Sequence, residues 1–101
     1  MLERRRSRRL PVDLYFNRYV DGHPYLCRAV NVSAGGALAH TYVEPDNQPG
    51  SFAVELELPG TTEPVWAWVH GKRRECGRLA MRFLGVSADD RQRLAEFVAG
   101  A

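Results

Sequence analysis

The alternation of apolar and polar residues along the chain predicts a series of short β-strands. In several segments every second residue is apolar, and this period of two turns one face of a strand inward. A further segment is apolar on both faces but rich in β-forming residues, so a strand is again expected. The expected strands cover residues 12–17, 25–30, 37–42, 52–58, 65–69 and 79–84.

Turn-forming residues separate these segments. Asp21-Gly22 is a strong hairpin signal, because both central residues of a type I′ turn need a positive φ. The other breaks are at Gly35-Gly36, 45–50, Pro59-Gly60 and Gly77. Six short strands joined at this spacing predict a small antiparallel barrel or sandwich.

The pattern then changes to the period of a helix. Three apolar residues fall at i, i+3 and i+4 on one face: Leu94, Phe97 and Val98. The hydroxyl of Ser87 lies three positions before Asp90, as in a capping box. We therefore expect a helix within residues 87–99, running from Ala88 to Ala99 and ended by Gly100.

Length and charge limit the kinds of function. A chain of 101 residues has room for one domain, residues 1–101. The first ten residues hold five arginines and one acid, a net +4, whereas the rest hold nine basic and eleven acidic side chains, a net −2. This favours a localised anionic partner over a general nucleic-acid-binding surface. We expect residues 1–10 to be a flexible arginine-rich arm and residues 11–84 to form the barrel.

Several classes of protein fit the sequence poorly. No apolar run follows the basic start, and none approaches the roughly 20 residues that span a bilayer, so a cytoplasmic protein without membrane insertion is expected. Cys27 and Cys76 lack metal-site spacing and are expected to be small hydrophobes in a reducing compartment. His23, His40 and His70 are scattered. We expect no metal, no cofactor and no enzymatic activity.

The first of two motifs with binding chemistry is the arginine run Glu3-Arg4-Arg5-Arg6-Ser7-Arg8-Arg9. A guanidinium group can grip a phosphate, pair with the O6/N7 edge of guanine, or stack on a base. Taken alone, the run is also typical of a solvated charged tail.

The second motif is Asn31-Val32-Ser33-Ala34-Gly35-Gly36. On an extended backbone Asn31 and Ser33 face the same side, where both offer hydrogen-bonding groups to a ligand. Gly36 lets the backbone turn or approach a ligand closely. Taken alone, this motif also fits a plain turn whose side chains bond their own backbone.

In this order, the two motifs resemble the PilZ domain family, a bacterial receptor module for cyclic di-GMP (c-di-GMP). The family signature is R-x-x-x-R followed later by (D/N)-x-S-x-x-G. Arg5 and Arg9 match its first part, and Asn31, Ser33 and Gly36 match its second. Residues 77–84 and 87–98 resemble the last strand and the C-terminal helix of the family, so the likeness covers nearly the whole chain.

The resemblance implies an all-β fold, a six-stranded antiparallel β-barrel, with one C-terminal α-helix, and a non-catalytic receptor of this second messenger. It implies a ligand site formed by Arg4, Arg5, Arg9, Asn31, Ser33 and Gly36. In it Arg5 and Arg9 clamp the ligand, Arg4 assists, Asn31 and Ser33 recognise a guanine edge, and Gly36 makes room. Binding would order the arm and relay the signal to a protein partner. Whether the protein is a monomer or a homodimer stays open.

Two other functions remain open. A PilZ-fold adaptor would bind a protein partner without nucleotide. A small barrel that binds single-stranded DNA or RNA would need a basic groove with aromatic residues along the body, which the acidic body disfavours. Trp66 and Trp68 share one strand face, where either the C-terminal helix covers one of them or they form a partner-binding patch. Lys72-Arg73-Arg74 is either a solvated strand edge or an accessory contact to a phosphate or a partner.

Overall fold

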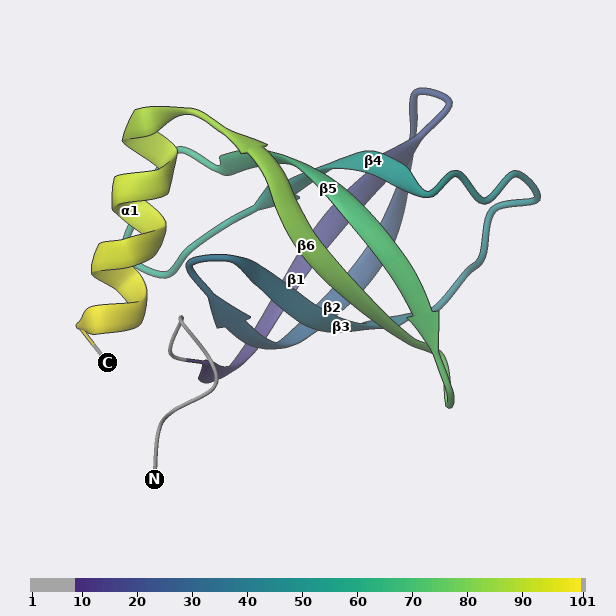
Figure 1. Ribbon diagram of the computed structural model, residues 1–101, viewed down its shortest axis with the longest axis horizontal. Coiled ribbons are helices and arrows are strands. Elements are labelled where there is room, and N and C mark those ends of the chain that lie inside the picture. The colour runs from purple at the N-terminus through teal and green to yellow at the C-terminus, as the bar shows by residue number, and fades with distance from the viewer. Residues whose placement is uncertain (1–8, 101) are drawn as a thin grey trace.

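The computed structural model describes residues 9–100, which form six strands and one helix (Figure 1). The elements are β1 (Leu10–Val20), β2 (His23–Ser33), β3 (Gly36–Thr41), β4 (Ser51–Leu56), β5 (Val65–Arg74), β6 (Arg78–Val86) and α1 (Ala88–Ala99). All neighbouring strands are antiparallel in the order β1-β2-β3-β6-β5-β4, and β4 pairs back onto β1 to close the barrel. The predicted fold class is confirmed, although the strands reach from residue 10 to residue 86 rather than from 11 to 84.

The hairpin between β1 and β2 has the predicted turn. Asp21 and Gly22 have φ values of 54° and 79°, and Val20 pairs with His23 on either side of them. This is the geometry of a two-residue turn with both central residues at positive φ. The β2 strand is longer than the weak pattern at 25–30 indicated, because it pairs with β1 and β3 as far as Ser33.

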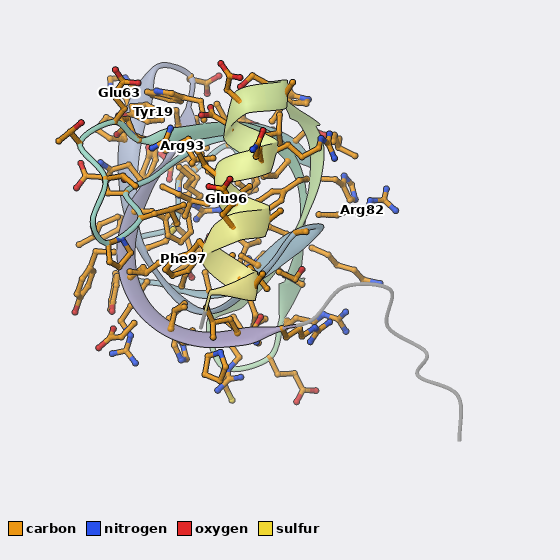
Figure 2. The ribbon with its side chains drawn as sticks, turned by 90° about the vertical axis from the view of Figure 1, so that its left-hand side faces the viewer. Tyr19, Glu63, Arg82, Arg93, Glu96 and Phe97 are labelled. Carbon is orange, nitrogen blue, oxygen red and sulfur yellow. The ribbon has the colours of Figure 1, made fainter. Side chains whose placement is uncertain are left out.

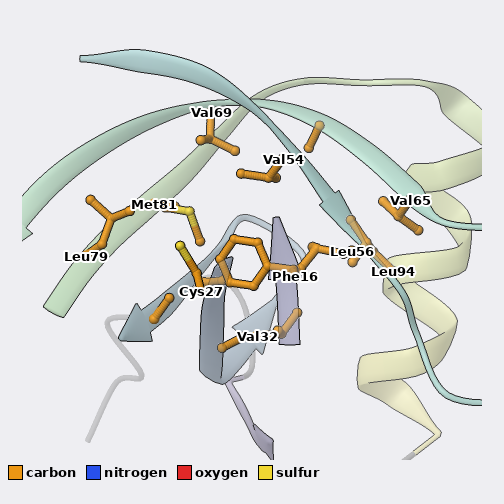
Figure 3. Close-up of a cluster of buried hydrophobic side chains, with 14 of the residues drawn as sticks. Phe16, Cys27, Val32, Val54, Leu56, Val65, Val69, Leu79, Met81 and Leu94 are labelled. Carbon is orange, nitrogen blue, oxygen red and sulfur yellow. The ribbon is translucent and has the colours of Figure 1, made fainter. Parts of the chain in front are cut away.

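The core fills the inside of the barrel with inward-facing aliphatic and aromatic side chains (Figure 3). The largest fully buried side chains are Leu56, Leu94, Val32, Val54, Val65, Val69 and Cys27. Burial raises the pKa of the Cys27 thiol to about 11. Cys27 is therefore the small core residue that was predicted. The same prediction is wrong for Cys76, which is exposed in the turn between β5 and β6.

Helix α1 lies across one end of the barrel (Figure 1), where Leu94 and Val98 are buried and Phe97 is half-buried. The Ser87 hydroxyl accepts the amide of Asp90 at 3.1 Å, which confirms the predicted cap. The Asp90 carboxylate in turn accepts the backbone N–H of Trp66 at 3.2 Å. The helix is thus tied to β5 by polar contacts as well as by its apolar face.

One charged side chain points into the barrel. Arg18 lies between Phe16 and Val20 on the inward face of β1 and is only 3% exposed. Its guanidinium pairs with the Glu44 carboxylate at 2.9 Å and lies 5.6 Å from the ring centroid of Phe52. A buried arginine is stable only with such partners, and the alternating pattern gave no sign of it.

Candidate functional site

A pocket of about 490 Å³ opens on the outer surface of the barrel where β2, β3 and β6 lie side by side. This volume falls within the range of small-molecule sites, roughly 300–1,000 Å³. Four residues predicted to bind ligand line it: Arg9, Asn31, Ser33 and Gly36. The other two, Arg4 and Arg5, and the predicted flexible arm of residues 1–10 as far as residue 8, lie outside the described residues.

Strand pairing brings Arg9 to the second motif. Arg9 directly precedes β1, and the first residues of that strand, Leu10 and Pro11, pair with Val32 and Asn31 of β2. The two motifs are separated by a whole hairpin in sequence, but the antiparallel return of β2 places them together. Arg9 is exposed, so its guanidinium is accessible at this point.

The side chains of Asn31 and Ser33 differ in what they contact. The Ser33 hydroxyl accepts the Gly35 N–H at 3.2 Å and lies 3.3 Å from the Gly36 carbonyl oxygen, to which it donates. Ser33 therefore stabilises the turn between β2 and β3 while it lines the pocket. Asn31 is half-buried in β2, and within residues 9–100 its side chain makes no hydrogen bond. No residue of the described range therefore occupies its amide.

Gly36 permits a close approach of two strands. It pairs with Arg82 across the β3–β6 ladder, and the backbone of Met81 occupies the space that a side chain at this position would need. Its φ is not positive, so the requirement is for room rather than for an unusual backbone conformation. The room made by Gly36 is taken by β6, not left free for a ligand.

Three arginines of β5 and β6 line the same pocket. Arg74 belongs to the run considered above as an accessory phosphate contact, whereas Arg78 and Arg82 were not among the predicted site residues. We call Arg74, Arg78 and Arg82 the β5–β6 arginines. Arg78 and Arg82 are four residues apart, a spacing that puts both on one face of a strand. That spacing was visible in the sequence, but nothing local indicated that β6 would lie next to β3.

The residues Lys72, Arg73 and Arg74 are all exposed, which agrees with the interpretation of this run as a solvated strand edge. These residues pair with β6 as far as Arg74, whereas the pairing of β5 with β4 ends at His70. The run extends past the end of β4, and its last residue lines the pocket.

Among residues 9–100, no acidic side chain compensates the positive charge of the pocket. Its lining includes four arginines and no acidic residue. Among the described residues, the ion pairs involve other arginines, namely Arg18, Arg28, Arg73 and Arg93. A concave site with uncompensated guanidinium groups attracts anions. Within residues 9–100, no three His, Cys, Asp or Glu side chains are grouped to hold a metal ion.

The two tryptophans lie on a different surface and remain uncovered. Trp66 and Trp68 are 45% and 51% exposed, so the helix does not shield them. The ring of Tyr19 packs 5.5 Å from that of Trp66, and its hydroxyl donates to Glu55, which raises the Tyr19 pKa. Tyr19 lies on the opposite side of the barrel from Arg82 (Figure 2). This aromatic surface is therefore separate from the pocket.

Nothing in residues 9–100 forms a helix that is both long and apolar enough to cross a bilayer.

A family model described as the PilZ domain matches residues 3–100 of the chain. No curated protein matches it.

Solved structures share the fold at low identity. An inhibitor of motility from Bacillus subtilis has a TM-score of 0.78 and 19% identity, and covers 98% of this chain. The match spans about half, 51%, of the Bacillus protein. The PilZ domain of YcgR from Escherichia coli, solved with c-di-GMP, has a TM-score of 0.68 and 24% identity, covering 97% of this chain and 91% of that one. An uncharacterized Legionella protein has a TM-score of 0.62 and 16% identity, with coverage of 91% and 90%.

Proposed function

The chain belongs to the PilZ domain family, and from this premise we propose that it is a cytoplasmic receptor for c-di-GMP that binds the ligand in the pocket beside β2, β3 and β6. PilZ domains are typically non-catalytic receptor modules, and the family generally binds this second messenger. One observation carries the proposal. Arg9, Asn31 and Ser33, from two motifs far apart in sequence, line one pocket.

The chemistry of the pocket suits the ligand. Cyclic di-GMP has two phosphates and two guanine bases. The Arg9 guanidinium offers a planar set of donors for a phosphate or for the O6/N7 edge of a guanine. The amide of Asn31, which makes no hydrogen bond within residues 9–100, offers a donor and an acceptor to a guanine edge. We assign Arg9 the role of clamp, and Asn31 with Ser33 the recognition of the base, on the wall of the barrel.

The proposal extends to the N-terminal arginines and to signalling. Arg5 and the auxiliary Arg4 would close over the ligand from the side opposite the barrel wall, so that binding orders the N-terminal arginine arm. The remodelled surface would then be read by a protein partner. Gly36 supports the site indirectly, because it lets β3 lie against β6.

Calorimetric titration of the purified protein with c-di-GMP tests this function. We expect saturable binding with a Kd of about 1 μM or below. GTP and the linear dinucleotide are the controls, because they carry the same base without the closed ring, and they should give no comparable heat. No response to c-di-GMP at concentrations well above this range would refute the proposal.

An adaptor that binds a protein partner without nucleotide is the second candidate. The exposed pair Trp66 and Trp68, on a surface separate from the pocket, favours it. Tryptophan is enriched at the centre of protein interfaces. A silent titration together with an intact, monodisperse protein would leave this candidate as the better one.

A further inference from the structure

The β5–β6 arginines stand at defined places along the pocket. Across the β3–β6 ladder Arg82 pairs with Gly36, next to the Ser33 turn, and Ala80 pairs with Leu38. Two residues before Ala80 on β6, Arg78 pairs with Arg74 of β5. Because paired residues point to the same face, the three guanidinium groups rise from the same outer surface that carries Asn31 and Ser33. Figure 2 shows Arg82 projecting away from the barrel.

The floor of the pocket, which is the surface between these arginines, is formed by apolar side chains that project little from the sheet. Arg78 and Arg82 are four residues apart on one strand, so their Cα atoms are separated by about 13 Å. Ala80 lies midway and contributes only a methyl group, with Leu38 beside it. A flat base can lie over this floor while guanidinium groups contact it or its phosphate from either end.

The charge of the β5–β6 arginines is costly to the free barrel. Arg74 and Arg78 are directly opposite each other, and like charges in that position destabilise a sheet. Within residues 9–100 no carboxylate lies in salt-bridge distance of any of the three. Three arginines around a concavity, with no carboxylate of the described range to pair with them, are typical of a site that binds a polyanion.

We propose, building on the proposed c-di-GMP function, that Arg78 and Arg82, assisted by Arg74, contact the bound ligand and form the second half of its site. Arg9 and Asn31 hold one part of the dinucleotide, and the β5–β6 arginines hold the part that extends over Ala80. The arrangement selects a ligand with two separated phosphates over a nucleotide with one, because only the former reaches both groups of arginines.

The test compares Arg78→Gln and Arg82→Gln with a matched control, Arg91→Gln. Arg91 is an exposed arginine on α1 outside the pocket, so its variant undergoes the same chemical change without touching the site. Each protein is titrated with c-di-GMP and with cyclic GMP, which has one phosphate, at low and high salt. The melting temperature of each ligand-free protein is measured in parallel.

We expect each pocket variant to bind c-di-GMP about tenfold more weakly than the wild type, with a smaller preference over cyclic GMP and a shallower salt dependence. The ligand-free melting temperature of Arg78→Gln should stay the same or rise, because the charge opposite Arg74 has been removed, and that of Arg82→Gln should stay the same. A merely structural role would lower it instead. Arg91→Gln should match the wild type in all respects.

The possible failures are distinguishable. Wild-type protein that does not bind c-di-GMP overturns the proposed function and this inference with it. Wild-type protein that binds, together with Arg78→Gln and Arg82→Gln variants whose affinities stay within about twofold of it, overturns the inference alone.

Discussion

A Cβ atom placed on Gly36 would clash with the backbone carbonyl oxygen of Met81, far inside van der Waals contact. Gly36 therefore decides how closely β3 approaches β6 at the rim of the pocket. We expect Gly36→Ala to push the two strands apart and to lower the free energy of unfolding by about 3 kcal/mol. The midpoint of urea denaturation measures this change, and c-di-GMP affinity should fall with it because Arg82 moves.

Gly85→Ala is the matched control for this prediction. Gly85 is also a strand glycine, but a Cβ atom there would meet only the Cβ of Trp68 at an ordinary 3.6 Å. Its effect on stability should stay within about 0.5 kcal/mol. If Gly36→Ala were as stable as Gly85→Ala, the close approach of β3 and β6 would not require glycine.

Arg9 provides the most direct test of the arginine motif, since it is the motif arginine that the structure describes and it lines the pocket. Replacing it with alanine removes charge-assisted hydrogen bonds, and we expect the Kd for c-di-GMP to rise by about 10- to 100-fold. The Kd of Arg9→Lys should fall between those of the wild type and Arg9→Ala, because an ammonium group keeps the charge but lacks the planar set of donors. Calorimetry measures both, with Arg91→Ala as control. Unchanged affinity in Arg9→Ala would remove Arg9 from the site.

Alanine substitutions of Asn31 and Ser33 should differ in their effects on c-di-GMP affinity and on protein stability. The Ser33 hydroxyl is engaged in its own turn, whereas the Asn31 side chain has no partner within residues 9–100. Asn31→Ala should therefore keep the wild-type melting temperature but weaken c-di-GMP binding about five- to tenfold. Ser33→Ala should weaken binding and also lose about 1 kcal/mol of stability. A destabilised Asn31→Ala protein would show that this amide has a structural role instead.

The fold was predictable because its signals are local. Period-two alternation marks the strands, Asp21-Gly22 has the φ values of its turn type, and Ser87 caps the helix. The place of Arg78 and Arg82 beside the pocket was not predicted, since it depends on β6 pairing with β3, some forty residues away in sequence. Strand order in a closed barrel is decided by non-local packing, which periodicity does not encode.

The structure describes part of the predicted ligand site, and its role in binding stays a prediction. Arg9, Asn31 and Ser33 line one pocket, whereas Arg4 and Arg5 lie outside the described residues. Ser33 fits the plain-turn interpretation, because its hydroxyl accepts the Gly35 N–H, and it lines the pocket as well. Gly36 makes room for a strand, which no inspection of the motif could reveal. The buried Arg18 was equally invisible, since its partner Glu44 comes from a distant loop.

Glu44 contacts two arginines, Arg18 inside the barrel and Arg73 on its surface. Its carboxylate pairs with Arg18 at 2.9 Å, lies 2.6 Å from the Thr41 hydroxyl that donates to it, and is 3.9 Å from Arg73. Burial alone would raise the pKa of Glu44, but the hydrogen bonds from Thr41 and Arg18 and the charge of the two arginines outweigh it. The pKa of this carboxyl is therefore lower than its usual value.

Glu44→Gln should consequently destabilise the protein in a pH-dependent way. The folded state holds the proton less tightly than the unfolded state, so the Glu44 contribution is fully present above the ordinary glutamate pKa of about 4.3 and is lost as pH falls through the lower folded value. We expect the variant to lose about 3 kcal/mol at neutral pH, because Arg18 stays buried without its counter-charge. Urea denaturation of both proteins across the acid range should show the difference shrinking on acidification. Glu57→Gln, at an exposed position outside this cluster, should show no such trend. A Glu44→Gln difference that is constant with pH would mean that the ion pair with Arg18 does not stabilise the barrel.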